Sequence, residues 1–157
     1  MKTLKILSIL FLSIYFISCK SNTKYEKVVI NKFPNGVPRM VNYLKTPGDS
    51  TSIVRELRYF DNGEIEMEGG IKDGYRDGEW KSYRKGGLLW SIMNYSKGYR
   101  EGINENWRDN GNRNFVGYYS KDKAHGLWQF FSYETGKLIK EITYENGEII
   151  KEENFDE

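Results

Sequence analysis

The fold of this chain is decided by the stretch Asp77-Gly78-Glu79-Trp80-Lys81-Ser82-Tyr83, which returns 48 residues later as His125-Gly126-Leu127-Trp128-Gln129-Phe130-Phe131. Gly102 lies midway between Gly78 and Gly126, so these three glycines are spaced by 24 residues each. A fixed spacing of this length is typical of a chain made from one repeated supersecondary unit. The sequence therefore predicts a repeat protein with a period of 24 residues.

Two rows of aromatic residues keep the same period. The first row is followed four residues later by a glycine in the first three units. The second row keeps step once a single extra residue before Gly136 is allowed. Four units are clear over residues 56–150, and a weaker one starts at Phe33-Pro34-Asn35-Gly36. The rows are Tyr59, Tyr83, Trp107 and Phe131, and then Tyr95, Tyr119 and Tyr144.

Each unit carries two turn signals about 11 to 13 residues apart, such as Asp61-Asn62-Gly63 and Lys72-Asp73-Gly74. Asn-Gly and Asp-Gly pairs between alternating segments are strong short-range signals of a β-hairpin. The space between these turns is too short for helices. The predicted fold class is therefore all-β, an elongated antiparallel sheet of stacked β-hairpin repeats of about 24 residues with about nine strands.

Side chains alternate along strands, so residues of one parity form columns across the repeats. In the second strand of each unit one parity is largely apolar, and we expect it to form the core face. The opposite parity, which includes Glu66/Trp90/Asn114/Ile139, is mixed and is expected to be partly solvated. Both aromatic rows are expected on one face. The apolar columns are Ile65/Leu89/Arg113/Leu138, Met67/Ser91/Phe115/Lys140, Gly69/Met93/Gly117/Ile142 and Ile71/Tyr95/Tyr119/Tyr144.

This pattern resembles the MORN-repeat variant (membrane occupation and recognition nexus) of bacterial proteins, whose units run aromatic residue, Asn-Gly turn, alternating strand, Gly and then Gly-x-Trp-x-x-Tyr. The stretches that begin at Asp77 and His125 match it best. The chain departs from it at Asn104 in place of Trp, at Asp122 in place of Gly, and at Glu56. The resemblance implies the same elongated sheet, and relatives include antitoxin-like proteins and lipoproteins without a defined ligand.

The N-terminus has the form of an export signal, because Lys2 and Lys5 precede an apolar run over Ile6–Ile17. In a helix these twelve residues span roughly 18 Å, which is less than the ~30 Å hydrocarbon core of a bilayer. A permanent transmembrane helix is therefore the less favoured alternative. We expect residues 1–18 to be a signal peptide.

A lipid attachment site is implied by Phe16-Ile17-Ser18-Cys19, which is similar to the lipobox of bacterial lipoproteins. In that motif the Cys is acylated on sulfur and becomes the new N-terminus. The resemblance implies that Cys19 anchors the protein in a membrane, and the alternative is that Cys19 is an ordinary small residue. Residues 19–27 are expected to hold the lipidated Cys and a polar tether, and residues 28–157 the repeat domain.

Charge supports a covalent anchor. Loss of Lys2 and Lys5 from the 24 basic residues leaves 22, which equals the 22 acidic residues. A neutral domain gains little from anionic lipid, whereas attached acyl chains hold it stably. We expect a membrane-anchored lipoprotein of the cell envelope, at the outer membrane facing the periplasm.

Composition excludes several other classes of function. The balance of 24 basic and 22 acidic residues does not suit a protein that binds nucleic acid. One Cys and one His leave too few ligands for a structural zinc site, and one Cys excludes a disulfide framework. We expect neither a metal nor another cofactor.

Candidate catalytic residues are few. His125 is the only histidine, but Asp77 and Glu101 take its place in the preceding units, which favours a polar turn residue before Gly126. Neither a Gly-x-Ser-x-Gly nucleophile elbow nor a phosphate-binding loop occurs in the sequence. The chain is therefore not expected to be an enzyme.

Three carboxylates form a further candidate site. Glu64, Glu66 and Glu68 are expected on one face of a strand, where they are candidates to bind a hard cation such as Ca²⁺. No oxygen-rich loop with ligand spacing accompanies them in the sequence. A solvated acidic stripe is the favoured interpretation.

The aromatic rows are the candidate ligand contacts, and two interpretations of them stay open. Either the rings pack on each other as the sheet curls, or they form an open groove for a peptide, a glycan or a partner strand. We expect a non-catalytic, lipid-anchored binding or scaffolding module of the cell envelope, whose partner is a protein or an envelope component. An antitoxin-like protein that neutralises a cognate toxin is the first alternative, and an enzyme that acts on envelope glycans is the second.

Overall fold

The computed structural model describes residues 24–46 and 50–156, and every regular element within these ranges is a β-strand. Eleven strands form one antiparallel sheet in sequence order, which confirms the predicted fold class, with more strands than predicted. The strands are β1 (Lys24–Lys32), β2 (Pro38–Thr46), β3 (Ser52–Tyr59), β4 (Ile65–Lys72), β5 (Tyr75–Tyr83), β6 (Leu89–Ser96), β7 (Tyr99–Trp107), β8 (Arg113–Ser120), β9 (Lys123–Phe131), β10 (Leu138–Glu145) and β11 (Glu148–Asn154).

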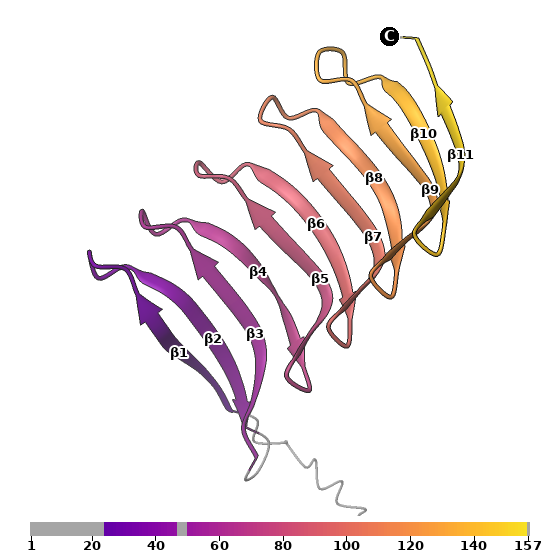
Figure 1. Cartoon of the computed structure of the whole chain (residues 1–157). Helices are drawn as coiled ribbons and strands as arrows, with labels where there is room; N and C mark the ends of the chain where they lie inside the picture. The colour runs from indigo at the N-terminus through magenta and orange to yellow at the C-terminus, as the bar shows by residue number, and fades with distance from the viewer. Residues whose placement is uncertain (1–23, 47–49, 157) are drawn as a thin grey trace, which may run out of the picture.

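The hairpins follow one another from β1 at one end of the molecule to β11 at the other, and the strands are bowed along their length (Figure 1). The substantial contacts of each strand are with its neighbours in the sequence, as in other repeat proteins. Among the described residues no second layer covers the sheet. Each repeat therefore presents side chains on two faces.

The turns along one side of the sheet are two-residue hairpin turns. Asp73 and Lys97 have φ of 52° and 50°, and each precedes a glycine with positive φ, the combination that a type I′ turn requires. Lys121 and Asp122 also have positive φ, 47° and 67°, so Asp122 occupies the position that glycine holds in the other turns. Successive turns are joined, since the Asp122 N–H donates to the Arg100 carbonyl at 3.0 Å.

The other side of the sheet carries loops of a second design. After β3, the Phe60 N–H donates to the Glu64 carbonyl at 2.9 Å, and the Gly63 N–H donates back to the Phe60 carbonyl at 3.0 Å. Gly63 has φ of 86°, a conformation that disfavours a side chain. The loop after β9 is longer, and there the Ser132 N–H reaches the Lys137 carbonyl at 2.8 Å. This longer loop contains the extra residue inferred from the sequence.

The glycines that define the period are not hairpin-turn residues. Gly78, Gly102 and Gly126 lie inside β5, β7 and β9, where positive φ values of 75°, 108° and 67° accompany shifts in strand register. Such shifts are β-bulges, which bend a strand and increase its twist. The expected tight turn at Gly126 is therefore wrong, because this residue bends the middle of a strand.

Strand pairing defines two faces, because residues directly opposite each other point to the same side. We call the side that carries Trp80 and Trp128 the tryptophan face, and the side that carries Leu57, Glu68 and Lys81 the reverse face. Three of the four predicted apolar columns lie on the tryptophan face, namely those that contain Met67, Gly69 and Ile71.

The fourth predicted column, Ile65/Leu89/Arg113/Leu138, lies on the reverse face instead. A bulge near the start of each second strand causes the difference: Arg58 pairs with Met67, but the next residue, Tyr59, pairs with Ile65. The same shift recurs between β5 and β6, β7 and β8, and β9 and β10. Simple alternation therefore fails at the residue beyond the bulge.

Fully buried apolar side chains are few in the described part of the chain. Trp80, Trp128 and Ile142 are 2%, 6% and 6% exposed on the tryptophan face, and Val41 and Leu57 are buried on the reverse face. The core is thus a thin layer on both sides of one sheet.

The N-terminal predictions fall mainly outside the described residues. These include the signal peptide over 1–18 and the lipid site at Cys19. The described sheet begins with β1 at Lys24, so residues 24–27, which were expected in the tether, belong to a strand.

Candidate binding site

The two predicted aromatic rows lie on opposite faces, which corrects the expectation that they share one. Trp80 and Tyr83 are three residues apart in β5, so alternation places them on different sides. The Tyr83 hydroxyl donates to the Glu68 carboxylate at 3.0 Å on the reverse face. The reverse-face row is Tyr59, Tyr83, Trp107 and Phe131, and the tryptophan-face row is Tyr95, Tyr119 and Tyr144.

The tryptophan-face row is packed against the buried tryptophans. Tyr119 and Tyr144 meet Trp128 edge-on, with ring centroids 5.1 and 5.7 Å apart. The Arg100 guanidinium covers the Tyr119 ring at 4.1 Å, and its Nε donates to Asp122 at 3.0 Å. Both rows are half-buried throughout. The geometry of the tryptophan-face row favours packing over an open ligand groove.

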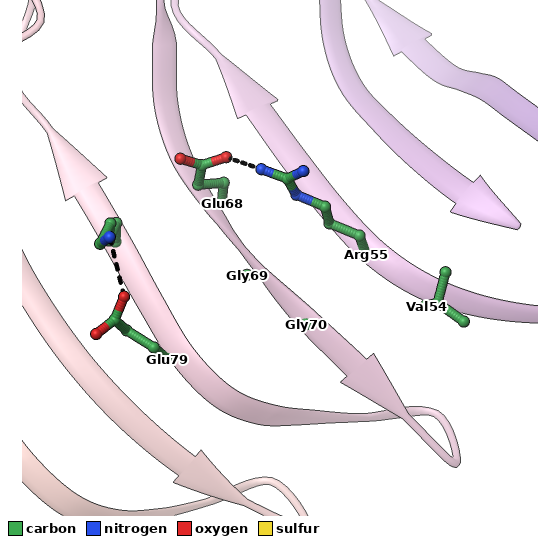
Figure 2. A pocket seen from close by; sticks show the side chains of 7 residues that line it. Val54, Arg55, Glu68, Gly69, Gly70 and Glu79 are labelled. Atoms are coloured by element: carbon green, nitrogen blue, oxygen red, sulfur yellow. Dashed lines mark hydrogen bonds and ion pairs between the residues drawn. The ribbon is translucent and has the colours of Figure 1, made fainter.

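On the reverse face, charged side chains form ion pairs with one another. A hollow of about 240 Å³ lies there beside Gly69 and Gly70, as Figure 2 shows, and Gly70 provides no side chain to fill it. Its walls carry an ion pair between Arg55 and Glu68 and a second at 3.0 Å between Lys81 and Glu79. Because each charge already has a partner, the hollow offers little attraction to an ionic ligand.

Burial and charge raise the pKa of two tyrosines. For Tyr83, burial is the main cause, and the hydrogen bond to the Glu68 carboxylate adds to it. For Tyr133, the hydrogen bond to Asp109 at 3.2 Å is the main cause. Both hydroxyls are therefore protonated donors at neutral pH.

A groove on the tryptophan face is the best candidate site. It consists of hollows of about 320 and 570 Å³ that share Arg84 and Trp90, and we call it the Trp90 groove. Trp90 is 45% exposed and Tyr133 is 42% exposed. Other residues that line it are Met67 and Ser82 in the smaller hollow, and Asn106, Asn114 and Phe115 in the larger one.

Two arginines have the same geometry in consecutive hairpins of this groove. The Arg84 Nη2 donates to the Trp107 carbonyl at 3.3 Å, and the Arg108 Nη2 donates to the Phe131 carbonyl at 3.0 Å. Each guanidinium also lies over an exposed ring, Arg84 at 5.6 Å from the centroid of Trp90 and Arg108 at 5.5 Å from the centroid of Tyr133. Both Nε atoms are buried without a hydrogen-bond partner among the described residues. The two side chains are therefore held in place while part of their donor capacity is unused.

Two asparagines fix the floor of the larger hollow. The Asn106 amide donates to the Trp90 carbonyl at 3.0 Å, and the Asn114 amide donates to the Asn106 side-chain oxygen at 2.9 Å. This chain of bonds orients both amides beside the exposed indole. The groove thus combines an aromatic surface with planar polar groups in fixed positions.

Two of the predicted ligand-contact aromatics, Tyr83 and Trp107, line this groove, but Trp90 is not among the residues predicted from the sequence. Trp90 was placed on the mixed parity, but the bulge turns it to the side of Met67 and Phe115. The signal that was available is the recurrence of Arg at positions 84 and 108, one period apart and each directly after a residue of the first aromatic row.

His125 lies on the surface of β9 and is exposed. Its ring is edge-on to Tyr118, with centroids 6.4 Å apart. Its counterparts act differently, because Asp77 accepts from the Lys97 N–H at 3.4 Å and Glu101 accepts from the Lys121 N–H at 2.8 Å. This position is therefore one that ties a strand to the turn of the next hairpin.

The three glutamates do not share one face as expected, because the bulge separates them. Glu64 lies in the loop and accepts from the Gly86 N–H at 2.7 Å, which is the main reason that its pKa is lowered. Glu66 lines the Trp90 groove, and Glu68 is bonded to Arg55 on the reverse face. They form no common cation site.

In the part of the chain that the structure describes, no cluster of three or more His, Cys, Asp or Glu side chains is placed to hold a metal ion. We also find in these residues no helix with the length and apolar character that a membrane crossing needs. Comparison with protein-family models gives no match, and comparison with curated proteins gives none either.

Proposed function

We propose that this protein is a non-catalytic binding module of the cell envelope, a MORN-repeat-variant lipoprotein anchored through Cys19, which engages an envelope component or a partner protein through its sheet. The exposed Trp90 beside two fixed arginines is the observation that carries this proposal. Partly exposed Trp, Tyr and Arg side chains are the usual anchors of binding surfaces.

The one-layer architecture supports a binding role. The sheet places successive loops side by side, so that residues from β6, β7, β8 and the loop after β9 meet in one groove. The larger hollow contains aromatic, amide and guanidinium groups, and its carboxylate, Asp109, accepts a bond from the Tyr133 hydroxyl. This is a set that holds and orients a ligand.

A pull-down from detergent-solubilised envelope tests the proposal, with the full-length lipidated protein as bait and Trp90→Ala as the comparison. We expect a component that is retained by the wild type and lost with the variant. Arg55→Gln, on the reverse face, is the matched control and should retain it. Equal recovery with wild type and Trp90→Ala would place the binding surface elsewhere. A single protein recovered at fixed stoichiometry would favour the antitoxin-like alternative.

The anchor has its own test. Wild-type protein should incorporate a labelled fatty acid, and Cys19→Ala should not. Equal labelling of the two proteins, or no labelling of the wild type, would show that the lipoprotein assignment is wrong.

A further inference from the structure

We infer that the Trp90 groove binds an acidic oligosaccharide, a glycan that carries carboxylate groups. This inference rests on the proposed function, since it names the class of ligand that the same surface takes. It combines three properties of the groove: unpaired positive charge, an exposed aromatic platform with oriented amides, and a position away from the sheet edges.

The charge comes from Arg84 and Arg108. Neither has an ion pair among the described residues, whereas Arg100 and Arg113 each pair with a carboxylate at 3.0 and 2.9 Å. The larger hollow contains these two arginines and one carboxylate, Asp109, so its formal charge is 2 − 1 = +1. Glu66 lines the smaller hollow, so the excess positive charge is confined to the larger one, where the carboxylate of the ligand binds. The planar guanidinium fork matches a carboxylate better than any other protein cation does. An anionic ligand supplies the partners that the chain itself does not.

The aromatic platform favours a sugar as the carrier of the carboxylate. The C–H faces of a pyranose ring pack on an indole, and its hydroxyls need donors and acceptors at the rim of that contact. Trp90 offers an accessible ring, and Asn106 and Asn114 lie beside it with amides held by hydrogen bonds. An amide has both a donor and an acceptor, which suits a hydroxyl that also has both. Preordered polar groups beside an apolar surface are the general pattern of a specific small-ligand site.

The location of the groove disfavours an extended peptide. A peptide that binds by strand addition needs a sheet edge, where backbone N–H and C=O groups are free. The Trp90 groove crosses the face above β5 to β8, whose backbone groups are paired on both sides. Its ligand is therefore recognised through side chains alone, and the larger hollow, of about 570 Å³, gives it room for more than one sugar ring.

The test is a calorimetric titration of the full-length lipidated protein in detergent micelles with oligogalacturonic acid. Its carboxyl-reduced neutral form and an oligoglutamate peptide of similar charge serve as the other two titrants. We expect the neutral sugar to bind at least about tenfold more weakly than the acidic one, because a charge-assisted hydrogen bond of about 1.5 kcal/mol is lost. Arg108→Gln should give a similar loss, Arg108→Lys a smaller one, and Arg55→Gln none.

Three results would overturn the inference: equal binding of the acidic and neutral sugars, binding of the oligoglutamate as tight as that of the acidic sugar, or no effect of Arg108→Gln in a protein whose thermal unfolding is unchanged. Absence of any binding by oligogalacturonate would also overturn it. If the pull-down still yields a component that depends on Trp90, the binding function stands and only the glycan assignment fails. Loss of both results would remove the two proposals together.

Discussion

The hairpins that contain Trp80 and Trp128 differ from the hairpin between them, which contains Asn104. The difference lies in the residue of the preceding strand that packs against each of these three side chains. Each tryptophan lies flat over a glycine of the preceding strand: a Cβ on Gly69 would be 2.2 Å from the Trp80 ring, and a Cβ on Gly117 would be 2.1 Å from the Trp128 ring. Each indole N–H donates to a carbonyl of the same neighbouring strand, at 3.0 and 3.1 Å. The large ring and the missing side chain therefore form one unit.

In the hairpin between them, the smaller side chain takes the place of the tryptophan and the larger one takes the place of the glycine. Asn104 takes the place of tryptophan and is 4% exposed, and the residue paired with it on the preceding strand is Met93 instead of glycine. The total volume at the site is thus kept while its division between two strands changes. Close-packed sites tolerate substitutions that conserve volume much better than those that do not. Asn104 is accordingly a second solution to the packing of a repeat, and its departure from the MORN-like pattern is matched by a change on the neighbouring strand.

The largest effect should come from Trp128→Ala, which removes the ring that packs with Tyr119, Tyr144 and Phe115. We expect a loss of about 3 to 5 kcal/mol in the free energy of unfolding, the range for a core aromatic. The matched comparison is Trp107→Ala, which is half-buried on the reverse face and should cost clearly less. Denaturant unfolding measures both, and equal losses would show that burial on the tryptophan face is not what stabilises the sheet.

The next largest loss of stability is expected at Gly117, the glycine that the Trp128 ring covers. Gly117→Ala places a methyl group inside the Trp128 ring position, and we expect a cost of about 1 to 3 kcal/mol from overpacking. Gly111→Ala is not a suitable control because its φ is 85°. Thr143→Ala, on the opposite face of β10, replaces it, and should cost much less. An unaffected Gly117→Ala protein would mean that the ring moves aside at no cost.

An exchange tests whether volume is shared across the pair. Asn104→Trp alone should destabilise the protein, because the new ring meets Met93. Met93→Gly alone should also destabilise it, by leaving a gap. The double variant should lose less than the sum of the two, by at least about 0.5 kcal/mol, since residues in contact couple. Additive losses in denaturant unfolding would show that the two sites are independent.

The sequence predicts the sheet well because its signals are local. Asn-Gly and Asp-Gly pairs mark turns, and the period indicates that hairpins follow one another, so the fold class could be predicted, although the sheet has eleven strands where about nine were expected. The faces were only partly accessible. The bulge between Tyr59 and Ile65 depends on hydrogen bonding across two strands, and it leaves no residue pattern of its own.

The candidate site could be predicted only in part, since Tyr83 and Trp107 line the Trp90 groove but the alternation of side chains assigns Trp90 itself to the mixed parity. The aromatic rows stand out in the sequence because they recur in each repeat. Residues that recur in this way are those that every repeat needs for packing. Trp90 has no tryptophan at the corresponding position of the other repeats, and its exposure depends on the face on which the bulge places it. Trp80 and Tyr83 could have been separated from the sequence, since three residues apart in a strand means opposite sides. In this protein, a residue that departs from the repeat pattern is a better guide to the binding surface than the residues that recur in it.

The smallest effect is expected at His125, where the difference between the Trp128 hairpin and the others is confined to the surface. Asp77 and Glu101 each accept a hydrogen bond from the backbone N–H of a turn residue in the following hairpin. The corresponding turn residue for His125 is Asn146, which has the same positive φ of 51°, so an aspartate at position 125 can accept from it as Asp77 does from Lys97.

We therefore predict that His125→Asp changes the free energy of unfolding by no more than about 0.5 kcal/mol, as for other exposed substitutions. His125→Ala, which can make no such bond, serves as the comparison and should not exceed the stability of the aspartate variant. Binding of the pull-down component should be unchanged at pH 6 and pH 8, because the Trp90 groove contains no atom of this residue. Loss of binding with unaltered unfolding would instead make His125 a functional residue.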